Sequence, residues 1–315
     1  MIPNIRAPRP DLIDRFNRRR ENVGDFFIVP DDYQLVPLAG SAKTLFSAHY
    51  GEKMHPGLGP QAEADLLYVQ QLRIVERLQQ TAGDFVIWDV GLGAAANAIA
   101  ALNATRHVRG RLHLISFDNT AEPLEFARAH AGDLGYLAGY ERQIDALLAD
   151  RRVEFKNGES DVCWEFHHGD FPDLLHSALR TPHSALRSPH AIFFDAFSPA
   201  KNPAMWTLAV FQDLFQCLDS KRPCALTTYS RSTMLRATLL LAGFFVGAGE
   251  ATGLKEETTV AANHRDLVPR LLDARWLARA SRSDSAEPLP GPVYRRAKLL
   301  AETLEKLRQH PQFQL

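Results

Sequence analysis

The stretch VIWDVGLGAAANAIAAL, from Val86 to Leu102, constrains the fold more than any other part of the 315-residue sequence. An apolar run ends at Asp89, passes through Gly91 and Gly93, and continues into small residues. An unbroken apolar run is typical of a strand covered on both faces, and glycines before small residues are typical of a turn that starts a helix. The stretch therefore predicts a strand–turn–helix unit of the kind that binds nucleotide-like ligands.

The chain after this unit alternates between apolar strands and segments with helical spacing. RLHLISFD, AIFFDAF and PCALTTYS predict strands, and helical segments separate them. This alternation predicts the α/β class, with a mostly parallel sheet and helices on both faces. Four aspartates fall at or just past strand ends: Asp89, Asp118, Asp170 and Asp195. Ligands bind beyond the carboxyl ends of such strands, so we expect these aspartates to gather around one crevice.

Other local signals predict smaller elements. Two β-type runs flank Asn157-Gly158, which predicts a hairpin. Helical spacing from Gln61 to Gln80 predicts one helix, and the preceding segment, broken by glycines, predicts a small β-ribbon. Residues 1–32, rich in Pro, Arg and Asp, are expected to be peripheral.

The bulk composition limits the classes of partner. Lys and Arg total 36 and Asp and Glu total 37, so the chain lacks the basic excess of a dedicated nucleic-acid binder. The three cysteines, Cys163, Cys217 and Cys224, have apolar neighbours in the sequence and no metal-type spacing, which predicts reduced core residues and no metal site. No run is long enough to span a membrane, and no secretory signal opens the sequence, so we expect a cytoplasmic protein.

The strand–turn–helix unit fits two cofactors. Gly91-x-Gly93-x-x-Ala96 matches a dinucleotide fingerprint, and Asp118 stands at a suitable distance to hold ribose hydroxyls, so an NAD-dependent oxidoreductase is one reading. Asp89 favours S-adenosyl-L-methionine (SAM), because a carboxylate before the turn suits the ammonium group of SAM and would repel a pyrophosphate. Asp170 either accepts from the adenine amino group or caps the following helix, and both roles stay open.

The segment FFDAFSPAKNPAMW follows a strand that ends at Asp195. Pro199 stiffens this loop, Lys201 and Asn202 offer donors, and Trp206 offers a stacking face. The loop is expected beside the crevice, where a methyl acceptor would sit. The alternative is a rigid connection that caps the next helix.

This loop also carries a resemblance. DAFSPAKNPAMW resembles the D-G-F-[AS]-P-A-K-N-P-x-[ML]-W motif of the SAM-dependent tRNA wobble-uridine methyltransferases, which form one part of the bifunctional 5-methylaminomethyl-2-thiouridine enzymes. DVGLGAAANAIAAL is similar to that family's E-x-G-F-G-T-G-L-N-F segment, with Asn97 at the asparagine and Ala94-Ala95 in place of threonine and glycine. LHLISFD, HHGDF and AGFFVGAGEATGLKEETTVA are similar to further segments, so the resemblance covers roughly residues 40–262.

The resemblance implies a class I SAM-dependent methyltransferase, with a Rossmann-like, seven-stranded, mostly parallel sheet. It implies N-methylation of an exocyclic amine on a tRNA wobble uridine, with tRNA as partner and SAM as cofactor. One Gly-rich unit is present, so we expect the methyltransferase part without the flavin oxidoreductase domain. The corresponding domains are residues 1–80 (β-ribbon and helix), 81–262 (SAM-binding methyltransferase) and 263–315 (helical extension).

Positions carried over from the family assign a role to each site residue. The methionine end of SAM would be lined by Asp89, Gly91, Gly93 and Asn97. Asp118 would hold the ribose and Asp170 would lie near the adenine. The acceptor amine would face Asp195, the catalytic residue, and a substrate loop that contains Phe197, Pro199, Lys201, Asn202 and Trp206.

Two other readings concern the acceptor. A methyltransferase that acts on a small molecule or a protein is the first alternative to a tRNA enzyme. His55, in the glycine- and proline-containing segment MHPGLGP, would either close over the acceptor or be an ordinary surface-loop residue.

Overall fold

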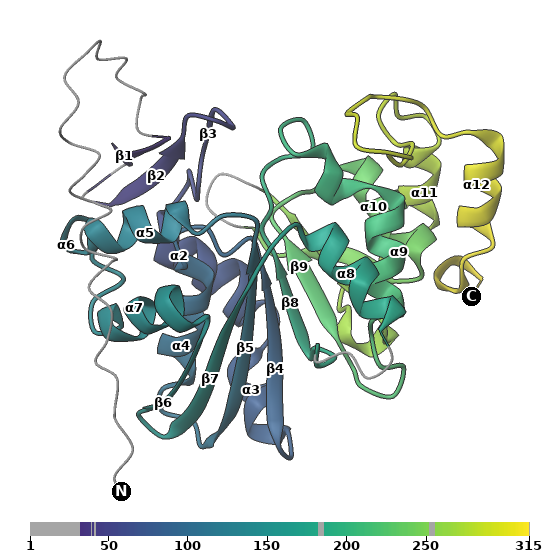
Figure 1. Ribbon diagram of the computed structural model, residues 1–315. Coiled ribbons are helices and arrows are strands. Elements are labelled where there is room, and N and C mark those ends of the chain that lie inside the picture. Colours follow the sequence, from purple (N-terminus) through teal and green to yellow (C-terminus); the bar gives the residue numbers. More distant parts are fainter. Residues whose placement is uncertain (1–31, 39, 41, 182–185, 252–255, 315) are drawn as a thin grey trace, which may run out of the picture. The chain divides into compact units, whose positions relative to one another are not determined.

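In the computed structural model, strand β4 (Asp84–Val90) lies inside an eight-stranded sheet (Figure 1). The order across the sheet is β10-β11-β9-β8-β4-β5-β7-β6. The other strands are β5 (Gly110–Asp118), β6 (Arg152–Asn157), β7 (Ser160–His168), β8 (Ala191–Phe194), β9 (Ala225–Thr228), β10 (Phe245–Gly249) and β11 (Thr258–Ala262). The neighbours from β9 to β7 pair in parallel, whereas β6 and β11 pair antiparallel. The predicted α/β sheet is therefore confirmed.

The structure describes residues 32–38, 40, 42–181, 186–251 and 256–314. Segment 1–31, which the sequence predicts to be peripheral, lies outside the described residues. Residues 182–185 of the loop before β8 and residues 252–255 between β10 and β11 also lie outside them. Residues Tyr33–Leu315 form one unit.

The described sheet has one strand more than the seven that the resemblance implies. The additional strand is β6, the first arm of the predicted hairpin, which extends the sheet beyond β7. Asn157 pairs with Ser160, so the two-residue loop is Gly158-Glu159 rather than Asn157-Gly158. Gly158 has φ 61°, and glycine at the first loop position is what a type II′ turn requires.

Helices cover both faces of the sheet because alternate side chains of β4 enter two different cores. Phe85 and Ile87 pack in one core, and Val86 and Trp88 pack in the other. The first core is covered by α2 (Pro60–Ala64), the π-helix η2 (Asp65–Gln70), α3 (Ile74–Gln80), α4 (Ala96–Thr105), α5 (Glu122–Ala129), α6 (Ala131–Leu134) and α7 (Glu141–Asp150). The second is covered by α8 (Phe171–Arg180), α9 (Leu208–Gln216), α10 (Thr233–Ala242), α11 (Ala274–Ala280) and α12 (Ala301–Arg308).

The prediction of a single helix from Gln61 to Gln80 is wrong, because the helix is not continuous. The segment divides into α2, η2 and α3, and Arg73 between the last two has a left-handed backbone with φ 51°. Just before this break, the Gln71 side-chain amide donates to Thr258 Oγ1 (3.2 Å) in β11. Tertiary contacts of this kind override the local helical spacing.

The predicted N-terminal ribbon is present as a separate three-stranded antiparallel sheet. It consists of β1 (Tyr33–Pro37), β2 (Lys43–Ser47) and β3 (Glu52–Lys53). The chain that leaves β3 carries Met54 and His55 to the carboxyl ends of the large sheet, where both line a cavity. None of the helices in the described ranges is long and apolar enough to cross a membrane.

The C-terminal segment closes the β10 edge of the sheet. It contains the short 3-10 helices η4 (Arg265–Leu267) and η5 (Pro311–Phe313) besides α11 and α12. In η5 the buried Gln312 side chain accepts from Val246 N (2.8 Å) and donates to Val246 O (2.8 Å) and Leu272 O (2.8 Å). One side-chain amide thus pairs with the edge strand as a neighbouring strand would.

Candidate active site

A cavity of about 440 Å³ lies where the turn after β4 meets the segments that follow β5, β7 and β8. Its volume lies within the range of about 300–1,000 Å³ that is typical of small-ligand sites. Seven predicted site residues line it: Gly91, Gly93, Asp118, Asp170, Asp195, Phe197 and Asn202. Five others are not in its wall: Asp89, Asn97, Pro199, Lys201 and Trp206. Three of the four strand-end aspartates therefore share one cavity.

Each glycine of the turn is needed for a different structural reason. Gly91 has φ 93°, and a Cβ there would lie 2.8 Å from the backbone oxygen of Asp195, so this glycine lets two loops approach closely. Gly93, with φ 49°, donates its N–H to Asp118 Oδ2 at 2.9 Å. Ala95 precedes α4 with φ 60°, so it adopts a left-handed conformation that favours glycine, at the position where the resembled family has one.

Two aspartates of the cavity differ in their surroundings. Asp118 accepts from Gly93 N through Oδ2 and from Thr120 N (3.3 Å) through Oδ1. Burial raises the pKa of Asp118, although these backbone donors oppose the shift. Asp170 is exposed at the N-cap position of α8, but within the described part of the chain its side chain makes no capping hydrogen bond. Its carboxylate is therefore available to a ligand in the cavity.

Asp89 lies outside the cavity wall and is fully buried. Its Oδ2 accepts from Ser116 Oγ at 2.9 Å, and Ser116 Oγ also accepts from Trp164 Nε1 at 3.0 Å. The other oxygen, Oδ1, has no hydrogen-bond partner among the described residues. Burial raises the pKa of Asp89 to about 8, so the group is largely protonated at neutral pH. Its assignment to the SAM ammonium stays a prediction.

Asp195 is held from two sides by residues distant in sequence. Asn97 Nδ2 donates to Asp195 Oδ2 at 2.9 Å, and His55 Nε2 lies 3.3 Å from the same oxygen. His55 Nε2 also lies 3.3 Å from Asn97 Oδ1. His55 has a left-handed backbone with φ 54° directly before Pro56, and such strain is common at functional sites. The reading of His55 as an ordinary surface-loop residue is therefore wrong.

In this arrangement His55 and Asp195 each shift the pKa of the other in the direction that favours an ion pair. Burial alone would raise the pKa of Asp195, but the hydrogen bond and charge of His55 and the Asn97 donor outweigh burial and lower it. Burial alone would lower the pKa of His55, but the Asp195 carboxylate outweighs burial and raises it. The cavity therefore presents an ionised carboxylate at the end of β8.

The loop after Asp195 is rigid, but one expectation about it needs correction. Trp206, expected to offer a stacking face to the acceptor, is fully buried in the second core, where it packs against Phe194 with 5.2 Å between ring centroids. Its Nε1 donates to Phe197 O at 2.8 Å, and this hydrogen bond holds the loop against the second core. Pro203–Trp206 form the 3-10 helix η3, and Thr207 caps α9.

The ribbon contributes residues that the sequence did not single out. Tyr50 stacks on Phe197, with 4.0 Å between ring centroids. Glu52 Oε1 accepts from Ser198 Oγ at 2.5 Å. The ribbon therefore clamps the loop after β8. No spacing signal joins these residues, because more than 140 positions separate Tyr50 and Glu52 from Phe197 and Ser198.

The described residues that line the cavity include five carboxylates. They are Glu52, Glu63, Asp118, Asp170 and Asp195. Lys53 and His55 are the basic side chains in the same described wall. The cavity therefore has an acidic lining that suits a cationic ligand.

A family model described as "S-adenosyl-L-methionine-dependent methyltransferase" matches residues 160–264. The chain is 30% identical over 251 residues to the tRNA 5-methylaminomethyl-2-thiouridine biosynthesis bifunctional protein MnmC of Aeromonas hydrophila, across 76% of this chain and 36% of that one. It is 29% identical to the protein of the same name from Cupriavidus metallidurans, across 77% of this chain and 36% of that one. The chain thus spans about a third of the length of these relatives.

Among solved structures, the crystal structure of MNMC2 from Aquifex aeolicus superposes with a TM-score of 0.62 and 25% sequence identity. The match covers 96% of this chain and 92% of that chain. The resemblance seen in the sequence is therefore confirmed, and with it the methyltransferase fold class and the SAM cofactor. The reading as an NAD-dependent oxidoreductase is set aside.

Proposed function

Because the chain is an S-adenosyl-L-methionine-dependent methyltransferase, we propose that it methylates an exocyclic amine on a tRNA wobble uridine. The names of its relatives support this substrate, and so does the loop motif from Asp195 to Trp206. The observation that carries the proposal is the position of Asp195, which lines the cavity beside that loop with Asn97 and His55 at its carboxylate.

The residues of the cavity fit the cofactor. SAM, when bound, supplies a methyl group already activated on a positively charged sulfur. The acidic wall matches that charge, Asp118 has oxygen lone pairs left for ribose hydroxyls, and the uncapped Asp170 carboxylate lies at the rim. We assign the ribose to Asp118 and the adenine edge to Asp170. Gly91 and Gly93 let the turn form, and the N-terminus of α4 lies behind it.

Asp195 orients the acceptor. Its carboxylate accepts a hydrogen bond from the amine N–H, which aims the nitrogen lone pair at the methyl group. The proton that the amine loses passes to this carboxylate or to water. Asn97 and His55 act through Asp195: they fix the oxygen Oδ2 and keep the carboxylate ionised.

The test is a methyl-transfer assay with SAM on total tRNA from cells that lack the modification. We expect one methyl group on the wobble-uridine amine, identified by mass spectrometry of the digested nucleosides. Fully modified tRNA, as the control, should accept none. Binding to the substrate tRNA should weaken steeply with salt, since phosphate contacts release counterions.

A SAM-binding protein that leaves every tRNA unmethylated would contradict the tRNA assignment. It would favour the small-molecule or protein acceptor. SAM affinity, measured by calorimetry on the same preparation, separates that result from an inactive protein.

A further inference from the structure

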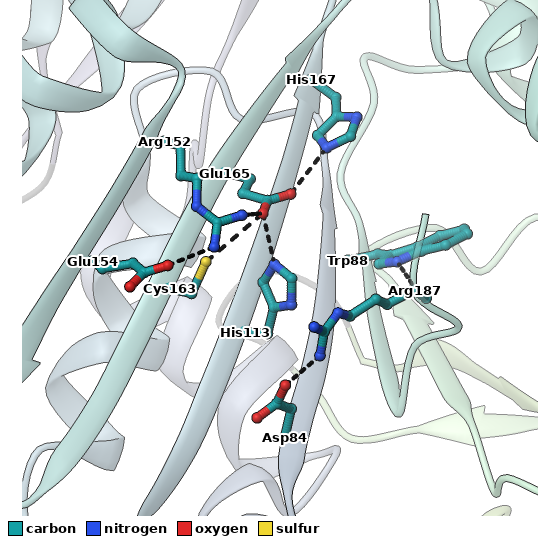
Figure 2. Close-up of polar contacts among 9 residues, drawn as sticks. All are labelled: Asp84, Trp88, His113, Arg152, Glu154, Cys163, Glu165, His167 and Arg187. Atoms are coloured by element: carbon teal, nitrogen blue, oxygen red, sulfur yellow. Dashed lines mark hydrogen bonds and ion pairs between the residues drawn. The ribbon is translucent and has the colours of Figure 1, made fainter. Parts of the chain in front are cut away.

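A second group of reactive side chains lies on the sheet itself, on the face that carries the second core. Along β7, Cys163, Glu165 and His167 alternate and share this face, and His113 of β5 pairs directly with Cys163 (Figure 2). None of these four side chains lines the cavity at the strand ends. The group is therefore separate from the candidate active site.

Three of these side chains have the spacing of metal ligands. His113 Nε2 lies 3.2 Å from Glu165 Oε1, and Cys163 Sγ lies 3.7 Å from the same oxygen. The three possible ligand atoms all lie within 4.8 Å of one another. Around a tetrahedral zinc ion, with bonds of about 2.0–2.3 Å, neighbouring ligand atoms are separated by about 3.3–3.6 Å. Small movements of the side chains would therefore complete three corners of a tetrahedron.

His113 supplies an independent observation. Its side chain is only 8% exposed, yet Nε2 makes no hydrogen bond with correct geometry to any described residue, although it lies beside Glu165. An unsatisfied buried nitrogen costs free energy, and a metal ion at this position would satisfy it. His113 and Cys163 also line a second hollow of about 460 Å³, which gives an ion access from solvent.

We propose that His113, Cys163 and Glu165 form a binding site for a transition-metal ion of the zinc type. A mixed nitrogen, sulfur and oxygen ligand set selects Zn²⁺ or Co²⁺ rather than Mg²⁺ or Ca²⁺. Binding replaces the thiol proton of Cys163 by the metal, and that proton passes to solvent without any change of oxidation state. His167 Nε2, 3.3 Å from Glu165 Oε2, orients the carboxylate from behind, and water completes the coordination.

Arg152 competes with a metal ion for the carboxylate of Glu165. It contacts Glu165 Oε1 in the structure, and it also contacts Glu154 Oε1 at 2.5 Å (Figure 2). Because Glu154 remains as a partner, Arg152 can release Glu165 when an ion binds. The nearby charges balance, because three arginines (Arg111, Arg187 and Arg152) pair with three carboxylates (Asp84, Glu154 and Glu165). A divalent cation therefore meets no net positive field before it binds.

Sequence spacing gives no signal for this site. His113 and Cys163 are 50 positions apart, and only the parallel register of β5 and β7 brings them together. The expectation of no metal site rested on apolar neighbours in the sequence, but alternate residues of β7 face opposite sides of the sheet.

The test is titration of the full, chelator-treated chain with Co²⁺, followed by absorption spectroscopy. We expect one equivalent to bind, with a thiolate-to-cobalt charge-transfer band in the near ultraviolet. Cys163→Ser should abolish the band and weaken Zn²⁺ binding, measured by chelator competition, by more than about 100-fold, because even loss of an outer-shell partner costs about 10–100-fold. Cys217→Ser, which removes another half-buried thiol, should keep both.

Arg152→Gln is the second variant, and it changes a half-exposed side chain. It frees Glu165, so we expect tighter Zn²⁺ binding, by about 10-fold. Less than half an equivalent of bound Co²⁺ in the unmodified chain, a band that persists in Cys163→Ser, or weaker binding in Arg152→Gln would each overturn the proposal.

Discussion

Asp195 lines the cavity, and Asn97 and His55 both contact its Oδ2, so its charge can be tested separately from its shape. Asp195→Asn keeps the shape and the contact with the cavity but removes the charge that orients the amine. We expect turnover to fall by about 10²–10⁴-fold, the usual contribution of such a group, while SAM affinity stays within a few fold. Asp173→Asn, an exposed change in α8, is the control in the same assays. Equal losses of turnover and SAM affinity would place Asp195 in the cofactor site instead.

His55 acts through Asp195, so its effect should be visible in the pH profile. The protonated imidazole lowers the pKa of Asp195. In His55→Gln that support is lost, the pKa of Asp195 rises, and the acidic limb of the kcat profile should move to higher pH. A lower kcat with an unmoved acidic limb would indicate a merely structural role.

Asp89 should make folding depend on pH in the opposite sense to a typical paired carboxylate. Its folded pKa of about 8 lies above the ordinary value of 3.8, because burial disfavours the charged form. Between these values the unfolded chain is ionised while the folded chain stays protonated, so this group lowers stability as pH rises. The slope is about 1.4 kcal/mol per pH unit.

Asp89→Asn removes this pH-dependent contribution to the free energy of unfolding. Urea unfolding at pH 5, 6 and 7 should therefore show a free energy of unfolding that falls less steeply with pH in the variant, by about 1 kcal/mol per unit. Asp173→Asn should leave the slope of the parent chain unchanged. Parallel curves for Asp89→Asn and the parent would mean that Asp89 is ionised in the folded state.

For single residues, the sequence predicted which positions belong to the site better than it predicted where their side chains point. The strand-end rule placed Asp118, Asp170 and Asp195 correctly at one cavity. It could not place Asp89 beneath the turn or Trp206 in the core, because both outcomes depend on which layer covers each side chain. The partnership of His55 with Asp195 joins positions 140 apart and has no local signal.

Among the elements, the β6–β7 hairpin depends on one glycine. A Cβ on Gly158 would lie 2.3 Å from the backbone oxygen of Arg106, and φ is 61°. Gly158→Ala therefore combines a clash with a left-handed backbone, and we expect it to lower the free energy of unfolding by at least about 2 kcal/mol. Chemical denaturation measures this directly.

Gly132→Ala is the matched control, since no atom of the described residues lies within 4 Å of a Cβ there and the residue belongs to α6. This change should be neutral or stabilising by up to about 1 kcal/mol. Similar losses for both variants would mean that helix or turn propensity, rather than the contact with Arg106, sets the effect.

The elements themselves were largely predictable, because a sheet covered on both sides leaves unbroken apolar runs such as FVIWDV. Breaks were not predictable. Helical spacing continues through Arg73, but the backbone there turns left-handed between η2 and α3. The spacing records which side chains are buried, whereas the break follows from contacts made after the helices pack.

For the molecule as a whole, Gln312 fastens the C-terminal segment to the sheet. Gln312→Ala leaves Val246 N–H and Leu272 C=O without these side-chain partners inside the protein. Each unsatisfied buried group costs about 1–3 kcal/mol, so we expect a loss of about 2–6 kcal/mol in thermal or urea unfolding. Gln309→Ala removes only an exposed contact to Glu305 and should change stability by less than about 0.5 kcal/mol. A neutral Gln312→Ala would show that water takes over both groups.

The acidic lining of the cavity also bears on how the reaction ends. Transfer of the methyl group removes the positive charge from the sulfur of the cofactor, so the spent cofactor is neutral overall. The carboxylates that attract the donor, among them Asp118 and Asp195, attract its product less. The same wall that favours loading therefore favours release, and product should inhibit the enzyme less than its near-identical shape would suggest.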